Sequence, residues 1–161
     1  GAGSSPPSTP VPTRPGAGVD GASDLLGYLT QEPLRRALRS QAPFEELYIQ
    51  LSAQAATCYG RSDRRRNASQ IEGEVAFLHF RRGELPQARA LFERQCRLYA
   101  REGWLHLLAA SLPCLVETER ALGHAGYAQS CLHLLSLPDP IAAASSVDKA
   151  ALLEQLVAFA T

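Results

Sequence analysis

The sequence has no excess of charge of either sign, no long hydrophobic run and no methionine. Its 16 Lys and Arg residues balance 16 Asp and Glu residues, so the formal net charge is zero. A nucleic-acid-binding domain usually needs a basic excess to neutralise phosphates, and anionic membranes attract basic segments in the same way. No apolar run reaches the roughly 20 residues that span a bilayer. These absences argue against nucleic acid or lipid as a direct partner.

Motifs for catalysis and cofactor binding are also missing, since there is no P-loop, no G-x-G-x-x-G and no G-x-S-x-G. The four cysteines form no C-x-x-C pair; they are Cys58, Cys96, Cys114 and Cys131. Because each lies among apolar residues, we predict reduced, buried thiols, as in a cytosolic protein. Cys131 and His133 are the only close Cys/His pair, and residues two apart on a helix diverge by about 200°. We therefore predict no catalytic residue, no cofactor and no metal site.

Several polar residues have an ordinary interpretation. Glu45, Glu46, Glu117 and Glu119 fall on polar faces of predicted helices, where solvation is the usual role. Residues 67–69 match the N-glycosylation sequon, but free cysteines indicate a cytosolic chain in which the sequon stays unmodified.

The arginine run Arg64, Arg65 and Arg66 leaves two interpretations open. It fits a solvated loop, 61–68, between two helices. It also fits a contact for an acidic partner surface or for lipid headgroups. Three charges alone would attract a membrane weakly, on the order of 1 kcal/mol each.

Composition divides the chain into two parts. Residues 1–22 are rich in Pro, Gly and Ser, so they cannot bury enough apolar surface to offset their ordering entropy, and we predict a disordered linker. Residues 23–161 show helical periodicity, without strand alternation and without an Asn-Gly or Asp-Gly hairpin signal. The chain has no initiator methionine and stops within a helical pattern, so we expect a segment of a longer protein.

Hydrophobic periodicity predicts helices over about 31–40, 43–59, 69–82, 85–101, 104–122, 125–137 and 147–160. The 43–59 helix has one wide apolar stripe, made of Phe44, Leu47, Tyr48, Leu51, Ala55, Cys58 and Tyr59. Helix ends are predicted at four glycines, Gly60, Gly83, Gly103 and Gly123. Pro86 suits a first turn, whereas Pro113 should kink its helix unless local packing compensates. The Pro138-Asp139-Pro140 sequence breaks the helical pattern.

An internal repeat connects two of these joints. Gly83, Ala88 and Phe92 have the same spacing as Gly123, Ala128 and Leu132, which lie 40 residues further along the chain. Glycine permits the left-handed turn between antiparallel helices, a small alanine lets them approach closely, and a large apolar residue fills the gap one turn later. This pattern is typical of tetratricopeptide-type repeats, whose usual period of about 34 is shorter.

The predicted fold is therefore all-α, with antiparallel helix pairs stacked as a tetratricopeptide-like α-solenoid; a plain helical bundle is the alternative. We predict Phe92, Trp104 and Tyr127 as core anchors.

Five stretches resemble the large subunit 10 family of the trafficking protein particle complex II (TRAPP II), in its plant and green-alga form. They are 48–59 (YIQLSAQAATCY), 71–76 (IEGEVA), 98–108 (LYAREGWLHLL), 112–113 (LP) and 126–137 (GYAQSCLHLLSL). The resemblance covers about residues 44–137, in the family's order and spacing. Two loops differ: arginines stand at 61–68, where the family has tryptophans, and Pro-Asp-Pro replaces an Asp-Lys-Gly turn after Leu137.

The resemblance implies a scaffold segment of a multisubunit vesicle-tethering complex that acts as a nucleotide-exchange factor for Rab GTPases in Golgi and trans-Golgi traffic. It implies a non-catalytic role, because exchange is attributed to small core subunits. The implied partners are other subunits, with the Rab GTPase and the membrane reached only through the complex. The implied location is cytoplasmic and peripheral at the Golgi and trans-Golgi network.

Two other functions are weighed against this one. A generic tetratricopeptide-like adaptor would bind a peptide or partner helix in a charge-complementary groove. The Ala- and Leu-rich helices favour helix packing over peptide capture. A helical enzyme would need convergent titratable groups in one cleft.

Overall fold

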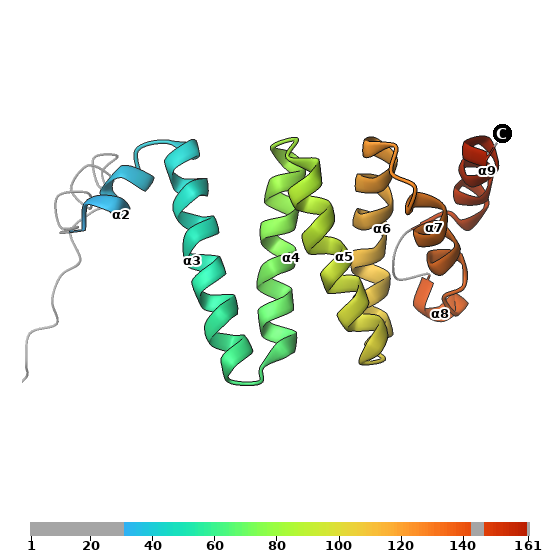
Figure 1. Ribbon diagram of the computed structural model, residues 1–161, viewed down its shortest axis with the longest axis horizontal. Helices are drawn as coiled ribbons and strands as arrows, with labels where there is room; N and C mark the ends of the chain where they lie inside the picture. The colour runs from blue at the N-terminus through green and yellow to red at the C-terminus, as the bar shows by residue number, and fades with distance from the viewer. Residues whose placement is uncertain (1–30, 143–146, 161) are drawn as a thin grey trace, which may run out of the picture. The chain divides into compact units, whose positions relative to one another are not determined.

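The structure of the protein is a computed structural model, which describes residues 31–142 and 147–160 (Figure 1). The linker predicted at 1–22 lies outside the described residues. The chain divides between Phe44 and Glu45 into two compact units. The first unit contains α2 (Glu32–Ala37), with Pro33 in its first turn and Ala37 buried, and the beginning of α3.

Every regular element in the described parts of the chain is a helix. The helices after α2 are α3 (Gln41–Arg61), α4 (Arg65–Arg81), α5 (Leu85–Arg101), α6 (Leu105–Leu122), α7 (Tyr127–Leu135), α8 (Asp139–Ala142) and α9 (Lys149–Ala160). In the second unit, α4, α5 and α6 run in alternating directions, and each packs against the next (Figure 1). The stack continues through α7 to α9. The prediction of an all-α solenoid of antiparallel helix pairs is confirmed.

Four turns between these helices share one geometry. Asp63, Gly83, Gly103 and Gly123 have left-handed φ angles of 55°, 74°, 72° and 60°. In each turn the following residue donates its backbone N–H, at 2.9 Å, to the carbonyl oxygen five positions earlier; the donors are Arg64, Glu84, Trp104 and His124. This is the 6→1 bond of a Schellman motif. The left-handed residues recur every 20 positions, so one helix pair occupies 40 residues, as the sequence repeat predicts.

The first of these turns corrects two predictions. Gly60 lies inside α3, which continues to Arg61, and Asp63 takes the left-handed position instead. Asp is one of the few residues that tolerate this conformation. The predicted loop 61–68 is also too long, because α4 begins at Arg65.

The second triple of the sequence repeat does not pack as predicted. Ala128 is half-buried and Leu132 is 58% exposed, whereas Tyr127, Cys131 and Leu134 face the core. The physical reason is that α7 begins four residues after Gly123, whereas α5 begins two after Gly83. The helix therefore presents a different face at the same offset. Residues buried at the Ala88 and Phe92 offsets do occur after Gly103, at Leu108 and Leu112.

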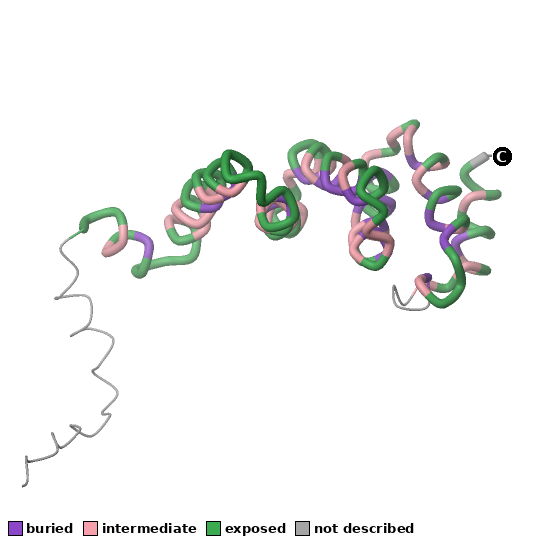
Figure 2. The backbone as a smooth tube through the Cα atoms, turned by 90° about the horizontal axis from the view of Figure 1, so that it is seen from below, coloured by how far each residue is buried: buried purple, intermediate pink, exposed green. Residues whose placement is uncertain are grey.

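The core lies between α4 and α9 and is densest around α5, α6 and α7 (Figure 2). Phe92 and Tyr127 are buried, and Trp104 is half-buried with its ring centroid 5.9 Å from that of Tyr99, so the predicted anchors are confirmed. Pro113 lies inside α6, which is one uninterrupted helix from Leu105 to Leu122. The predicted break at 138–140 lies after the end of α7 at Leu135, and Asp139 and Pro140 begin the short helix α8.

A close approach joins α4 to α5. Gln95 is 5% exposed and donates from Nε2 to the Ser69 carbonyl oxygen at 2.9 Å and to the Tyr99 hydroxyl at 3.1 Å. Gly73 makes room for it, since a Cβ at that position would lie 2.2 Å from the same Nε2. A side chain at position 73 would therefore displace a buried amide.

Candidate protein-interaction surface

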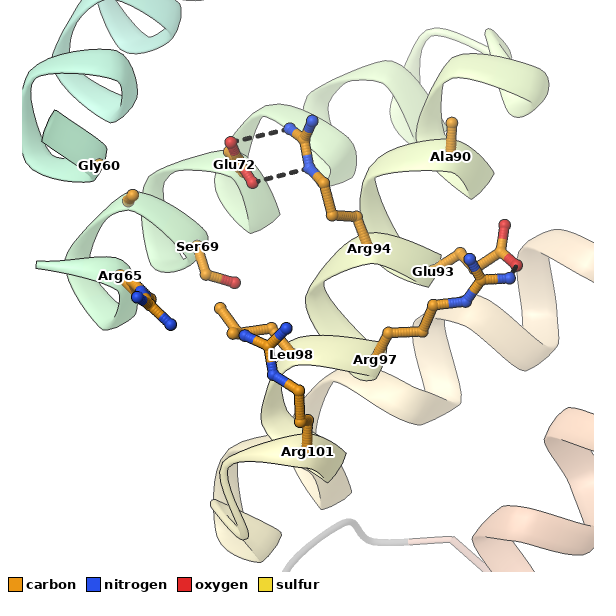
Figure 3. A pocket seen from close by; sticks show the side chains of 11 residues that line it. Gly60, Arg65, Ser69, Glu72, Ala90, Glu93, Arg94, Arg97, Leu98 and Arg101 are labelled. Carbon is orange, nitrogen blue, oxygen red and sulfur yellow. Dashed lines mark hydrogen bonds and ion pairs between the residues drawn. The ribbon is translucent and has the colours of Figure 1, made fainter. Parts of the chain in front are cut away.

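A groove of about 590 Å³ opens beside the end of α3, between α4 and α5 (Figure 3). Its lining includes Arg65 from the first turn of α4, and Arg94, Arg97 and Arg101 from α5. We call it the arginine groove. Spacings of three and four residues place the three α5 arginines along one side of that helix.

Each arginine of the groove already has an acidic partner. Arg94 pairs with Glu72 across the α4–α5 boundary through two contacts, of 2.8 and 3.1 Å, which Figure 3 shows. Arg97 pairs with Glu93 one turn earlier on α5. These pairs fix the positions of the guanidinium groups in the groove.

The other two arginines share acidic residues in the turns. Arg65 lies 2.9 Å from Asp63 and 3.9 Å from Glu102, and Arg101 lies 3.0 Å from Glu102. Surface ion pairs of this kind stabilise a fold by about 1 kcal/mol or less. Their main consequence here is to orient the cations rather than to hold the helices together.

The cations lie outside three of their four carboxylate partners; the fourth, Asp63, is 81% exposed. The four arginine side chains are 58–77% exposed, whereas Glu72, Glu93 and Glu102 are only 25–32% exposed. Ser69 lines the same groove, and its buried Oγ has no hydrogen-bond partner among the described residues. The groove therefore presents a cationic outer layer above a polar floor.

A second cleft, of about 320 Å³, lies between α5, α6 and α7 and contains Glu119. The Glu119 side chain is 3% exposed, so the prediction that it lies on a solvated face is wrong; this side of α6 is covered by α5 and α7. Its Oε1 lies 3.3 Å from Arg89, and its buried Oε2 has no hydrogen-bond partner among the described residues. His124 Nδ1 accepts a hydrogen bond from the Gly126 N–H, so it does not donate to Glu119, 3.8 Å away.

Large apolar side chains form a third surface feature. Leu132 on α7, Leu153 on α9 and Val157 on α9 are each 52–58% exposed, and Phe77 on α4 is 50% exposed. Exposed apolar side chains favour contacts with other proteins where they form a contiguous patch.

The structure separates the arginines of the 64–66 run. Arg64 precedes α4, Arg65 enters the arginine groove, and Arg66 lies beside Trp104 and Ile141 in a different depression. The run is therefore mostly helical rather than a loop. Its sequence alone gave no sign that Arg65 would meet three arginines from α5, because those residues are about 30 positions away.

The thiols do not share one environment. Burial raises the pKa of Cys96 to about 12 and also raises the pKa values of Cys114 and Cys131. Cys58 is exposed on α3 and Cys114 is half-buried, so the prediction that all four thiols are buried holds only for Cys96 and Cys131. The described residues include no group of three or more His, Cys, Asp or Glu that could hold a metal ion.

The remaining polar side chains form separate local pairs and do not converge on one site. His79 Nδ1 lies 2.5 Å from Glu84, and this hydrogen bond is the main cause of the lowered pKa of that carboxyl group. Glu117 is half-exposed and pairs with Arg120, as expected for a solvated face. None of the described helices is both long and apolar enough to cross a bilayer.

The sequence of the chain is similar to those of known proteins. The family model described as "TRAPPC10/Trs130, NTS-like domain" matches residues 18–160. A "Trafficking protein particle complex II-specific subunit 130 homolog" of Arabidopsis thaliana is 39% identical over 110 residues, which cover 68% of this chain and 9% of that protein. The homolog of the same name from Oryza sativa is 38% identical over 92 residues, 56% of this chain and 7% of that protein. The chain thus spans about a tenth of the relatives' length. No solved structure matches it.

Proposed function

Because the chain belongs to the TRAPPC10/Trs130 NTS-like domain family, we propose that it is a scaffold segment of a TRAPP II-type vesicle-tethering complex. The observation that carries the proposal is the family match over 18–160, which includes all the described helices. In this role the chain is non-catalytic. It binds other subunits of a complex that activates Rab GTPases at the Golgi and trans-Golgi network, and it reaches the membrane only through that complex.

The helix stack supports a mechanism based on contact. Solenoids present extended surfaces, because each repeat packs only on its neighbours. Leu132 and Leu153 are exposed on α7 and α9, where a neighbouring subunit would bury them. Burial of apolar area stabilises association by roughly 25 cal/mol per Å² before the entropy of association is subtracted.

Affinity purification from green-plant or algal cells tests the proposal. We expect the tagged chain to recover TRAPP II subunits, and a variant with Leu132→Lys and Leu153→Lys to recover less. Leu38→Lys is the matched control, because Leu38 is 55% exposed but lies in the other unit. Recovery of no complex subunit by the unmodified chain would contradict the proposal.

A second candidate function is a peptide-binding adaptor. The arginine groove supports it, since charged residues on helix faces are what such adaptors use to hold a peptide. The two functions are compatible, because a scaffold segment can hold a peptide of a neighbouring subunit.

A further inference from the structure

We propose that the arginine groove is a docking site for an acidic segment of a partner protein, a stretch of chain that carries several Asp or Glu residues. The inference deepens the proposed function, because it gives the chemistry of one partner. It rests on the proposal that the chain works by protein contact. It can be tested on the full 161-residue chain without any other subunit.

The geometry provides a row of donors. Arg94, Arg97 and Arg101 lie along α5, and the first and last are seven positions apart, which is about 10 Å along a helix that rises 1.5 Å per residue. Arg65 comes from α4 and lines the same groove. Figure 3 shows side chains from both helices around one opening. A peptide lying along α5 would meet cations at several successive positions.

The arginines keep binding capacity beyond their present partners. A guanidinium group has five N–H donors, and one carboxylate accepts at most two in a bidentate pair. The carboxylates of the groove lie deeper than the guanidinium groups, as their exposed fractions show. An incoming carboxylate can therefore accept from the outer N–H groups while the existing pairs hold each arginine in place.

The charge around the groove favours an anionic ligand. Four arginines and two glutamates line it, and Asp63 and Glu102 pair with Arg65 and Arg101 from beside it, so these charges balance one another. Arg61 and Arg64 are exposed at the adjoining α3–α4 turn, and no ion pair to a described residue involves either of them, which leaves an excess of two positive charges beside the groove. The excess is local, since the whole chain is neutral.

The shape of the groove and its partly buried glutamates favour a peptide over other anions. A membrane surface is broad and flat, whereas these arginines line a recess between helices. A nucleic acid carries a phosphate at every nucleotide, so some phosphates would lie near Glu72 and Glu93. A peptide with separated carboxylates can place them on the guanidinium groups and keep neutral residues near those glutamates.

Fluorescence anisotropy with a labelled Glu-rich peptide tests the inference. We expect saturable binding that weakens as salt rises, because salt screens exposed charges within about 10 Å at 0.1 M. The same peptide with every Glu replaced by Gln should not bind. Binding of both peptides with equal affinity, or binding of neither, would overturn the proposal.

Two variants locate the site. Arg97→Gln and Arg101→Gln should each weaken binding roughly fivefold, since an exposed pair contributes up to about 1 kcal/mol. Both side chains are exposed and pair only within or next to α5, so these variants should fold. The matched control is Arg120→Gln, an exposed, ion-paired arginine on α6 outside the groove, which should change affinity less than twofold. Equal losses in all three variants would indicate a general charge effect and would overturn the site.

The same variants distinguish the source of the anion. Vesicles containing phosphatidylserine should bind the chain weakly and without dependence on Arg97 or Arg101. If vesicles bind through these arginines and the peptide does not, the ligand is a lipid surface and the proposal is wrong. Peptide binding without recovery of TRAPP II subunits from cells would preserve this inference and contradict the proposed function. Recovery of TRAPP II subunits without peptide binding would support the proposed function and contradict this inference.

Discussion

The helix pairs α3–α4 and α5–α6 have similar lengths and the same turn geometry, but they bury very different side chains. The buried residues of α3 are Ser52 and Ala56, and those of α4 are Ser69, Val75 and Ala76. In α5 and α6 they include Phe92, Cys96, Tyr99, Leu108, Leu112 and Leu115. The first pair therefore buries mainly small and polar side chains, and the second buries large apolar ones.

An apolar stripe therefore predicts a helix but not the burial of that helix. On α3, Phe44 and Leu51 of the predicted stripe are each 50% exposed. The contacts of α3 with α4 include polar ones, such as the hydrogen bond of 2.7 Å that the Tyr48 hydroxyl donates to Glu74. Both pairs keep helical periodicity, but only α5–α6 has neighbours that cover it on two sides.

Core truncation should give the largest contrast between the pairs. Leu108→Ala should lower the free energy of unfolding by about 2–5 kcal/mol, because it leaves a cavity at a fully buried position. Leu51→Ala on α3 should lower it by less than about 1 kcal/mol, since half of that side chain is already in water. Urea unfolding monitored by circular dichroism measures both. Similar losses in the two variants would refute the comparison.

The α4–α5 boundary links the two pairs and should show the next largest effect. Gly73→Ala should lower stability by roughly 1–3 kcal/mol, because its Cβ would displace the Gln95 amide from its two buried hydrogen bonds. In the Gln95→Ala background the same substitution should cost much less, since the clashing atoms are gone. A double-mutant cycle from thermal or urea unfolding measures this coupling. Additive effects would show that Gly73 is not required by Gln95.

Substitutions at the left-handed turn residues should change stability by smaller amounts, and in opposite directions in the two turns. Asp63→Gly in the α3–α4 turn should raise stability by about 0.5–1 kcal/mol, because glycine adopts a left-handed φ without steric strain. The exposed ion pair between Asp63 and Arg65, which this substitution removes, stabilises the fold by less than that gain. Gly103→Ala in the α5–α6 turn should lower stability by about 1 kcal/mol, although the space around it is open. Calorimetric melting temperatures should move in opposite directions.

Thiol reactivity distinguishes the pairs without changing their stability. At pH 8, Cys58 on α3 should react readily with a thiol reagent, whereas Cys96 on α5 should react only after unfolding, because burial hides its thiol and raises its pKa to about 12. Mass spectrometry of peptides, with urea-unfolded protein as the control, measures the two rates. Equal rates in the folded chain would contradict the burial of α5.

The same raised pKa has a consequence for alkaline stability. The unfolded chain ionises Cys96 near its ordinary value of 9.0, and the folded chain does so only near 12. The stabilising contribution is therefore complete below pH 9 and is lost as the pH rises toward 12. A Cys96→Ala variant should show less loss of stability over this interval, relative to its own value at pH 8.

The fold was largely predictable from local patterns. Helical periodicity and the glycines at 83, 103 and 123 define α4 to α7 to within a few residues of the described bounds. The helix end predicted at Gly60 was wrong, because residues other than glycine can also adopt the left-handed conformation and Asp63 does so here. The solvated position predicted for Glu119 was wrong, because its face of α6 is polar in sequence but is covered by α5 and α7 in the fold.

The arginine groove was not predictable in the same way. Arg65 was singled out as part of a charged run, but its partners Arg94, Arg97 and Arg101 are separated from it by the rest of α4 and the start of α5. Their meeting depends on how far α4 and α5 run before they turn. Short-range patterns do not contain this information.

The 20-residue spacing of the left-handed turn residues makes the chain sensitive to the length of each helix. Loss of one residue within α5 would rotate all later positions on that helix by about 100°, which would move Cys96 and Tyr99 off the core face and break the row of arginines. Loss or gain of a whole 40-residue helix pair would leave every face in phase. Such a chain is expected to lengthen and shorten in the course of evolution by whole helix pairs, while the distance between successive turns stays constant.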